Sequence, residues 1–193
     1  MREGCHLNLS ERITFILDGV KTASKEELYK ALIGLNIQKE ELMPLIKEDR
    51  SKPYYRKLLY KNEHLELLVM NWSDLECAPH DHGHSFGWIQ VINGVSRNTV
   101  YKVKGEALPS ELFTELKREG KTFFAPKFGV HKMAEAGNTG LITLHLYAPP
   151  ITGMKVYDLE KCAACVVSDD CGAWWPDDLR QQVKEIKLKS AAD

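Results

Sequence analysis

The feature that most restricts the fold is a series of short apolar or alternating runs that begins near Lys52. Glycine, proline, asparagine and aspartate separate these runs at the spacing typical of an all-β sandwich or barrel. The Asn93–Gly94 pair between two of the runs favours a hairpin. SELFTELKREG (110–120) is predicted to interrupt the series as a short helix. The β-like runs are YYRKLLY, LELLVMNW, FGWIQVING, SRNTVYKV, KTFFA, VHKMAEAG, GLITLHLYAPP and GMKVYD.

The first fifty residues have a helical pattern instead. SERITFILDGV carries apolar residues at helical spacing, and SKEELYKALIGL begins with a capping box made by Ser24 and Glu27. QKEELMPLIKED is a third candidate helix, which Pro44 either breaks or ends. We therefore expect one mainly β domain. Its expected parts within 1–193 are a small helical layer (1–50), a β-barrel or jelly roll (52–175) and a polar, fraying tail (176–193).

Composition excludes several classes of function. The 193 residues carry a net charge of −1, so the chain has no overall charge that would favour nucleic acid or an anionic membrane. No apolar run approaches the roughly 18–20 residues of a membrane helix, and the first residues lack the apolar region of a signal peptide. Five cysteines, an odd number, then favour reduced thiols in a cytoplasmic protein over a disulfide framework.

The densest chemical signal is the histidine cluster in PHDHGHSFGWIQVINGV (79–95). In an extended segment, residues two apart share a face, so His80 and His82 can present two imidazoles to one metal ion, with Asp81 on the other side. His131 in PKFGVH is the best candidate for a third ligand. His84 has the same parity, but Gly83 makes a regular strand there doubtful. The alternatives are a histidine-rich surface loop and, at 131, a histidine that is merely hydrogen-bonded.

A family resemblance follows from these residues. HDHGHSFGWIQVINGV, PKFGVH and LITLHLYAPPI together resemble the cupin superfamily and, within it, the cysteine dioxygenases. A general cupin has a glutamate ligand after its His-x-His pair, and Gly87 stands at that place here. Thiol dioxygenases characteristically lack the glutamate and bind iron through three histidines. The resemblance covers 54–155 and implies a cupin jelly-roll barrel behind the helical layer.

The same resemblance implies roles for individual residues. His80, His82 and His131 match the Fe(II) ligands. Arg56, in YYRKLL, falls where the family binds the substrate carboxylate, and Tyr54 at the neighbouring tyrosine of that pocket.

The run TLHLYAPP completes the implied site. Tyr147 matches the active-site tyrosine and His145 the histidine behind it, while Thr143 stands where vertebrate enzymes have a serine. These three alternate along one strand, so they share a face and are able to form a hydrogen-bonded relay. Three of the implied site residues have a structural alternative: Arg56 as a surface ion-pair partner, Tyr147 as a strand-end core residue and His145 as a buried structural histidine.

Gly87 also bears on the substrate. Vertebrate cysteine dioxygenases carry at this position a cysteine that is cross-linked to the tyrosine, so Tyr147 is expected to be free, as in many bacterial relatives. The 3-mercaptopropionate dioxygenases share the glycine but usually have glutamine where Arg56 stands, which favours cysteine here.

The expected activity is therefore oxidation of L-cysteine by O₂ to cysteine sulfinate at a mononuclear Fe(II) site, by a monomer whose partners are a small thiol and O₂. The alternatives are oxidation of 3-mercaptopropionate or another thiol, a zinc or manganese cupin isomerase, and a non-catalytic cupin sensor that holds a ligand without turnover. Three histidines also suit zinc, so the ligand set does not fix the metal.

The late cysteines raise a separate possibility. Cys162, Cys165 and Cys171 lie in CAACVVSDDC, where a CxxC pair is half of a structural zinc site. Cys5 and Cys77 offer no second pair, so reduced thiols on a late strand are the favoured interpretation. Cys77 precedes His80 by three residues, and the sequence leaves open whether its thiol approaches the proposed pocket.

Overall fold

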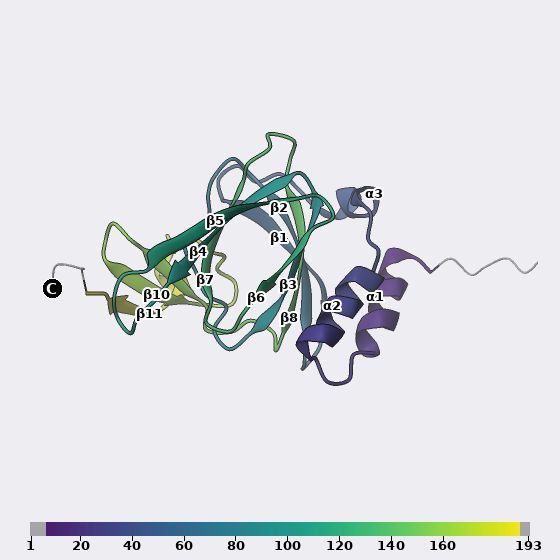
Figure 1. Cartoon of the computed structure of the whole chain (residues 1–193), viewed down its shortest axis with the longest axis horizontal. Helices are drawn as coiled ribbons and strands as arrows, with labels where there is room; N and C mark the ends of the chain where they lie inside the picture. Colours follow the sequence, from purple (N-terminus) through teal and green to yellow (C-terminus); the bar gives the residue numbers. More distant parts are fainter. Residues whose placement is uncertain (1–6, 190–193) are drawn as a thin grey trace, which may run out of the picture.

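The apolar runs become the strands of a barrel, as Figure 1 shows. The structure is a computed structural model that describes residues 7–189. Its larger sheet has the strand order β1-β2-β8-β3-β6, and all of its pairs are antiparallel. The strands of this sheet are β1 Tyr54–Lys61, β2 Glu66–Trp72, β3 Phe86–Asn93, β6 Thr122–Ala125 and β8 Ile142–Ala148.

A second run of strands closes the barrel. One sheet has the order β5-β4-β7 and another the order β11-β10-β9. His80 joins them, because its backbone bridges His131 on β7 and Val156 on β9. The strands of these two sheets are β4 Val95–Lys102, β5 Ser110–Arg118, β7 Val130–Glu135, β9 Lys155–Asp158, β10 Ala163–Val167 and β11 Gln182–Lys187.

The predicted helices form a layer beside the larger sheet (Figure 1). They are α1 Leu9–Asp18, α2 Lys25–Gly34 and α3 Lys39–Leu42, followed by the 3₁₀ turn η1 Met43–Leu45; a second 3₁₀ turn, η2 Leu179–Gln181, precedes β11. Ser24 caps α2 by accepting from the Glu27 backbone N–H, as expected. The Glu27 carboxylate instead accepts from Lys21 and Thr22, so the capping box is only half formed. Pro44 lies in η1, in the last turn of this helical segment.

The two sides of β8 explain how one strand serves both the core and the site. Leu144 and Leu146 belong to the apolar cluster shared with the helices, while Tyr147 belongs to the cluster inside the barrel. Thr143 and His145 have the parity of Tyr147 and point to the same face. Every residue of β8 is buried. The barrel interior therefore receives three polar side chains in a row from its central strand.

Three further sequence-based expectations differ from the structure. The run 110–120 is not a helix, because Ser110–Arg118 pairs with β4 along its length as β5. Asn93–Gly94 is not a hairpin turn, since β3 and β4 lie in different sheets and the chain turns a corner between them. The segment 176–193 is not all tail: β11 pairs with β10, and residues 190–193 lie outside the described part. Within residues 7–189, no helix combines the length and apolar character that crossing a membrane requires.

Candidate metal centre

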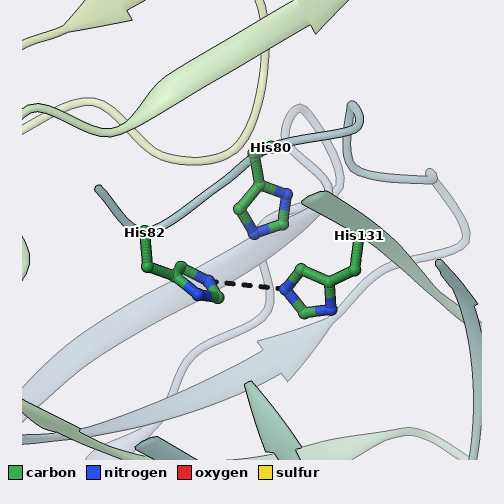
Figure 2. Close-up of side chains that lie close together, drawn as sticks. All are labelled: His80, His82 and His131. Carbon is green, nitrogen blue, oxygen red and sulfur yellow. Dashed lines mark hydrogen bonds between the residues drawn. The ribbon is translucent and has the colours of Figure 1, made fainter. Parts of the chain in front are cut away.

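Three histidines converge inside the barrel. The imidazoles of His80, His82 and His131 are buried, and one nitrogen from each lies within 4.8 Å of the others. Figure 2 shows the rings facing one another, with Nε2 of His82 3.4 Å from Nε2 of His131. Among residues 7–189, this is the one group of three or more His, Cys, Asp or Glu side chains whose ligand atoms converge in this way.

Backbone pairing sets the spacing of two of these residues. The His80 N–H donates to the His131 carbonyl at 2.9 Å, and the His131 N–H donates to the His80 carbonyl at 3.0 Å. After His82 the chain turns sharply at Gly83, where φ is +58° and a Cβ atom would lie only 2.6 Å from the Thr152 carbonyl oxygen. Both the conformation and the lack of space require glycine there. The sheet and this turn therefore fix the points from which the imidazoles project.

Asp81 points away from the cluster, as the strand parity predicts. Its buried carboxylate accepts from the backbone N–H of Gly83 at 2.9 Å and of Lys155 at 3.2 Å. The Tyr157 hydroxyl donates to the other oxygen at 3.4 Å, and the Lys155 ammonium lies 3.9 Å away. Asp81 thus ties the segment between the two histidines to β9.

The hydrogen bonds of the imidazoles suit a cation between them. His80 Nδ1 donates to the Ala78 carbonyl and His131 Nδ1 to the Asn98 Oδ1, both at 2.9 Å, which leaves both Nε2 lone pairs free. His82 Nδ1 is buried and has no hydrogen-bond partner in the described chain. Two nitrogens each about 2.1 Å from one ion are roughly 3.0–3.4 Å apart, which matches the His82–His131 separation. The donor set therefore fits a divalent metal.

Burial keeps these histidines neutral. Desolvation lowers the pKa of His80, and it lowers the pKa values of His82 and His131 well below the ordinary range, with a further lowering from the neighbouring imidazoles. A neutral imidazole is the form that binds a metal. Among residues 7–189, the site consequently presents three neutral donors and no carboxylate.

A hydrogen-bonded chain lies beside the cluster. Trp72 Nε1–H donates to Thr143 Oγ1 at 2.9 Å, Thr143 lies 2.7 Å from His145 Nε2, and His145 Nδ1 lies 3.0 Å from the Tyr147 hydroxyl. Because the buried Thr143 O–H has His145 Nε2 as its acceptor, His145 carries its proton on Nδ1 and donates to Tyr147. The Tyr147 O–H is then left free, and it lies 3.3 Å from His82 Nε2 at the edge of the histidine cluster.

The acid–base properties of this chain support that orientation. Burial lowers the pKa of His145 to about 3, so its imidazole is neutral at pH 7. Burial also raises the pKa of Tyr147 well above 10, so its hydroxyl keeps its proton. The relay predicted from strand parity is therefore present, and it ends in a hydrogen-bond donor that faces the histidine cluster.

Gly87 lies directly beneath the tyrosine. It pairs with Tyr147 across β3 and β8. A Cβ atom at position 87 would lie 2.8 Å from Tyr147 Cδ1 and would meet the Leu146 carbonyl at still closer range. In this backbone arrangement the tyrosine ring occupies the space that a glutamate or cysteine side chain would need.

The proposed substrate-binding residues line one cavity together with two of the clustered histidines. Tyr54 and Arg56 line it together with His80, His82, His145 and Tyr147. Its remaining walls are apolar: Leu68, Met70, Trp72, Met133, Ile151 and Met154. Arg56 is therefore the one permanently charged side chain of this lining. Burial raises the pKa of Tyr54, so this phenol also remains a donor.

Other candidate ligands lie outside the cluster. His84 is exposed and makes an edge-to-face contact with Phe128, with ring centroids 4.8 Å apart. Cys77 Sγ lies 3.9 Å from His80 Nδ1, which is not the nitrogen that faces the other histidines. Burial raises the Cys77 pKa to about 12, so the thiol is protonated.

The late cysteines do not form a metal site within residues 7–189, since no group of three ligand atoms includes them. Cys165 lies on β10 and is buried with Cys171 in one apolar cluster, while Cys162 is partly exposed. Cys5 lies outside the described residues.

Two residues of the site escaped sequence analysis. Asn98 supports His131, and Trp72 begins the relay. Both lie on strands that are remote in sequence from their partners. Neither carries a local motif, so only the pairing of β4 with β7 and of β2 with β8 reveals them.

Solved cupin-like structures resemble the chain at low identity. A conserved protein with a double-stranded β-helix domain from Klebsiella pneumoniae is 18% identical with a TM-score of 0.45, over 58% of this chain and 90% of that one. KdgF from a Halomonas species is 17% identical with a TM-score of 0.42, over 53% and 85%. An RmlC-like cupin from Shewanella frigidimarina is 22% identical with a TM-score of 0.40, over 53% and 81%.

The family comparison is more specific. The family described as cysteine dioxygenase type I matches residues 18–160, which include α2, the barrel strands β1 to β9, the three histidines and the relay. That range is well over half of the chain. A three-histidine centre inside a cupin barrel is the arrangement expected of a thiol dioxygenase. The chain belongs to the cysteine dioxygenase type I family.

Proposed function

We propose that this protein oxidises L-cysteine with O₂ to cysteine sulfinate, using a single Fe(II) ion held by His80, His82 and His131. The observation that carries the proposal is an all-imidazole donor set of which His80 and His82 line the same cavity as Arg56. The reaction balances without another reactant, because RSH and O₂ together contain every atom of RSO₂H. The proposal includes action as a cytoplasmic monomer, without nucleic acid or membrane.

The donor set suits this chemistry. When bound, Fe(II) supplies a centre at which a thiolate and dioxygen are brought together and electrons pass from sulfur to oxygen. Imidazoles are donors of borderline softness, so an ion that they hold would also accept a soft thiolate from the substrate. No protein carboxylate is required, since the substrate itself contributes a negative charge.

The chain's own residues bind and orient the substrate. The Arg56 guanidinium offers a bidentate, charge-assisted grip on a carboxylate, and the Tyr54 hydroxyl adds a second donor beside it. Tyr147, held by the His145 Nδ1–H, directs its own O–H towards the centre of the cluster. Such fixed donors keep sulfur and oxygen in reacting geometry and supply a hydrogen bond where charge develops.

Oxygen consumption tests the proposal directly. The Fe(II)-loaded protein is given L-cysteine, 3-mercaptopropionate or cysteamine, and the sulfinate is quantified. We expect L-cysteine to be the best substrate. If no thiol is consumed above the metal-free background, the proposed activity is wrong. Metal analysis after purification without added metal addresses the isomerase and zinc alternatives, because imidazole sites generally bind Zn(II) more tightly than Fe(II).

An arginine variant tests the choice of substrate. Arg56→Gln removes the guanidinium and should lower kcat/KM for cysteine about tenfold to hundredfold, since a hydrogen bond to a charged group is lost. Cysteamine, which has no carboxylate, should be nearly unaffected. Arg97→Gln is the matched control, because Arg97 pairs with Glu76 on the outside of the barrel. Equal losses for both thiols would remove Arg56 from carboxylate recognition.

A further inference from the structure

A C-terminal segment that the family match does not include reaches back to the cavity. Residues Ser168–Ala173, here called the strap, follow β10 and lie beyond the matched range 18–160. Ser168, Asp169 and Cys171 line a cavity of about 280 Å³ that adjoins the metal-site cavity. The residues shared by the two linings are Arg56, Leu68, Ile151 and Met154. Arg56 therefore stands at the boundary between them, against the strap.

The strap holds the guanidinium of Arg56 through its backbone. Arg56 Nη2 donates to the Asp169 carbonyl at 2.9 Å, and Nη1 donates to the Cys171 carbonyl at 3.5 Å. A guanidinium has five N–H donors, so three remain for other acceptors. Two carbonyls on one side of the planar group also restrict its rotation.

The strap also fixes the second carboxylate donor. The Ala173 N–H donates to the Tyr54 hydroxyl oxygen at 2.7 Å, which leaves the Tyr54 O–H free to donate elsewhere. Trp174, the next residue, packs its ring edge-on against Tyr54 at a centroid distance of 5.4 Å. The Ala173 carbonyl accepts from the Ala78 N–H at 2.8 Å, two residues before His80.

We propose that the strap is a specificity-determining element that holds the Arg56 and Tyr54 donors in place for thiols that carry a carboxylate. The inference rests on the proposed function and deepens it. Donors that are already oriented lose little conformational freedom when they bind a carboxylate, so the strap strengthens binding without touching the ligand. The strap residues are positioning residues, because they act through Arg56 and Tyr54.

The structure offers a precise way to disturb the strap. A Cβ at Gly172 would collide with the Trp174 ring, because three ring atoms would lie within 2.7 Å of it. Gly172→Ala should therefore shift the strap and loosen its grip on Arg56. Gly34→Ala is the matched control, because no atom lies within 4 Å of a Cβ there. A second variant, Trp174→Leu, relaxes the strap without adding bulk, and Trp88→Leu, against Tyr29 and Phe124, is its control.

Kinetics with three thiols test the proposal in the Fe(II)-loaded, full-length protein. Gly172→Ala and Trp174→Leu should lower the cysteine-to-cysteamine ratio of kcat/KM about tenfold, mainly through KM for cysteine. 3-Mercaptopropionate should lose as much as cysteine. The iron content of both variants should equal that of the wild type. The Gly34→Ala and Trp88→Leu controls should keep the wild-type ratio. Equal losses for all three thiols, or no loss in either variant that folds, would overturn the proposal.

A spectroscopic measurement separates this proposal from the proposed function. In ¹⁵N-arginine-labelled protein, the Arg56 guanidinium, identified by its loss in Arg56→Lys, should show restricted rotation that Gly172→Ala and Trp174→Leu abolish. If the wild type oxidises no thiol but Arg56 shows restricted rotation, the proposed activity is wrong. The proposal that the strap holds Arg56 is then still supported. A freely rotating Arg56 in the wild type would refute the strap whatever the activity.

Discussion

Asn98 offers a quantitative test of how the barrel supports its metal ligands. Its Oδ1 accepts from His131 Nδ1 at 2.9 Å, and both side chains are buried. Asn98→Ala leaves that N–H without an acceptor, which costs about 1–3 kcal/mol. Loss of a partner behind a metal-bound histidine typically weakens metal binding about 10–100-fold, which corresponds to a similar energy. We therefore expect metal affinity to fall by one to two orders of magnitude.

The assay is a competition titration of Fe(II) or Co(II) against a chelator, with thermal unfolding measured alongside. Asn71→Ala is the matched control, since Asn71 also lies on a strand and makes one side-chain hydrogen bond, to the Lys47 carbonyl, away from the histidines. The control should bind metal as the wild type does. Equal metal affinity in Asn98→Ala and the wild type would show that Asn98 does not support His131.

Three further predictions concern Gly87, Tyr147 and Glu27. Gly87→Ala should destabilise the protein by about 1–3 kcal/mol, because the new Cβ crowds Tyr147 and the Leu146 carbonyl; an unchanged melting temperature would contradict this. Tyr147→Phe should lower kcat by about a hundredfold with little change in metal content, since the relay loses its terminal donor; full activity would exclude that role. Hydrogen bonds from the Thr22 hydroxyl and the Lys21 and Thr22 N–H groups lower the Glu27 pKa from 4.5 to about 2. Because the folded pKa is depressed, this stabilisation is complete above pH 4.5 and is lost as the pH falls towards 2. The difference in melting temperature between wild type and Glu27→Gln should therefore vanish over that interval, and a difference independent of pH would refute the assignment.

Local patterns predicted most of the strands but not all of the sheet. The eight expected β runs form strands because each alternates or is wholly apolar between turn residues. The run 110–118 misled because Leu112, Phe113 and Leu116 have helical spacing, yet these side chains are exposed and the segment is held by pairing with β4. The helix expected there has no core to pack against, so tertiary pairing overrides the local pattern.

The site, like the fold, could be predicted only where a local sequence pattern determines the structure. The histidine pair and the relay could be found because their members lie two residues apart in an extended segment, where parity decides which face they share. Asn98, Trp72 and the strap could not, because their contacts join segments that are far apart in the sequence and use backbone carbonyls as often as side chains. The identity of a residue does not reveal which contacts its backbone N–H or carbonyl makes.

The reciprocal backbone hydrogen bonds between His80 and His131 bear on how such a site can change during evolution. Because sheet pairing sets the separation of these two positions, replacing either imidazole with another donor leaves its point of attachment where it was. Position 87 is different, since the Tyr147 ring and the Leu146 carbonyl leave no room for a side chain there. The barrel thus fixes where a donor at 80 or 131 is attached, while the Tyr147 ring keeps a protein donor out at 87. A fourth protein ligand at 87 would first require the Tyr147 ring to move, whereas a new donor at 80 or 131 would start from the existing backbone position.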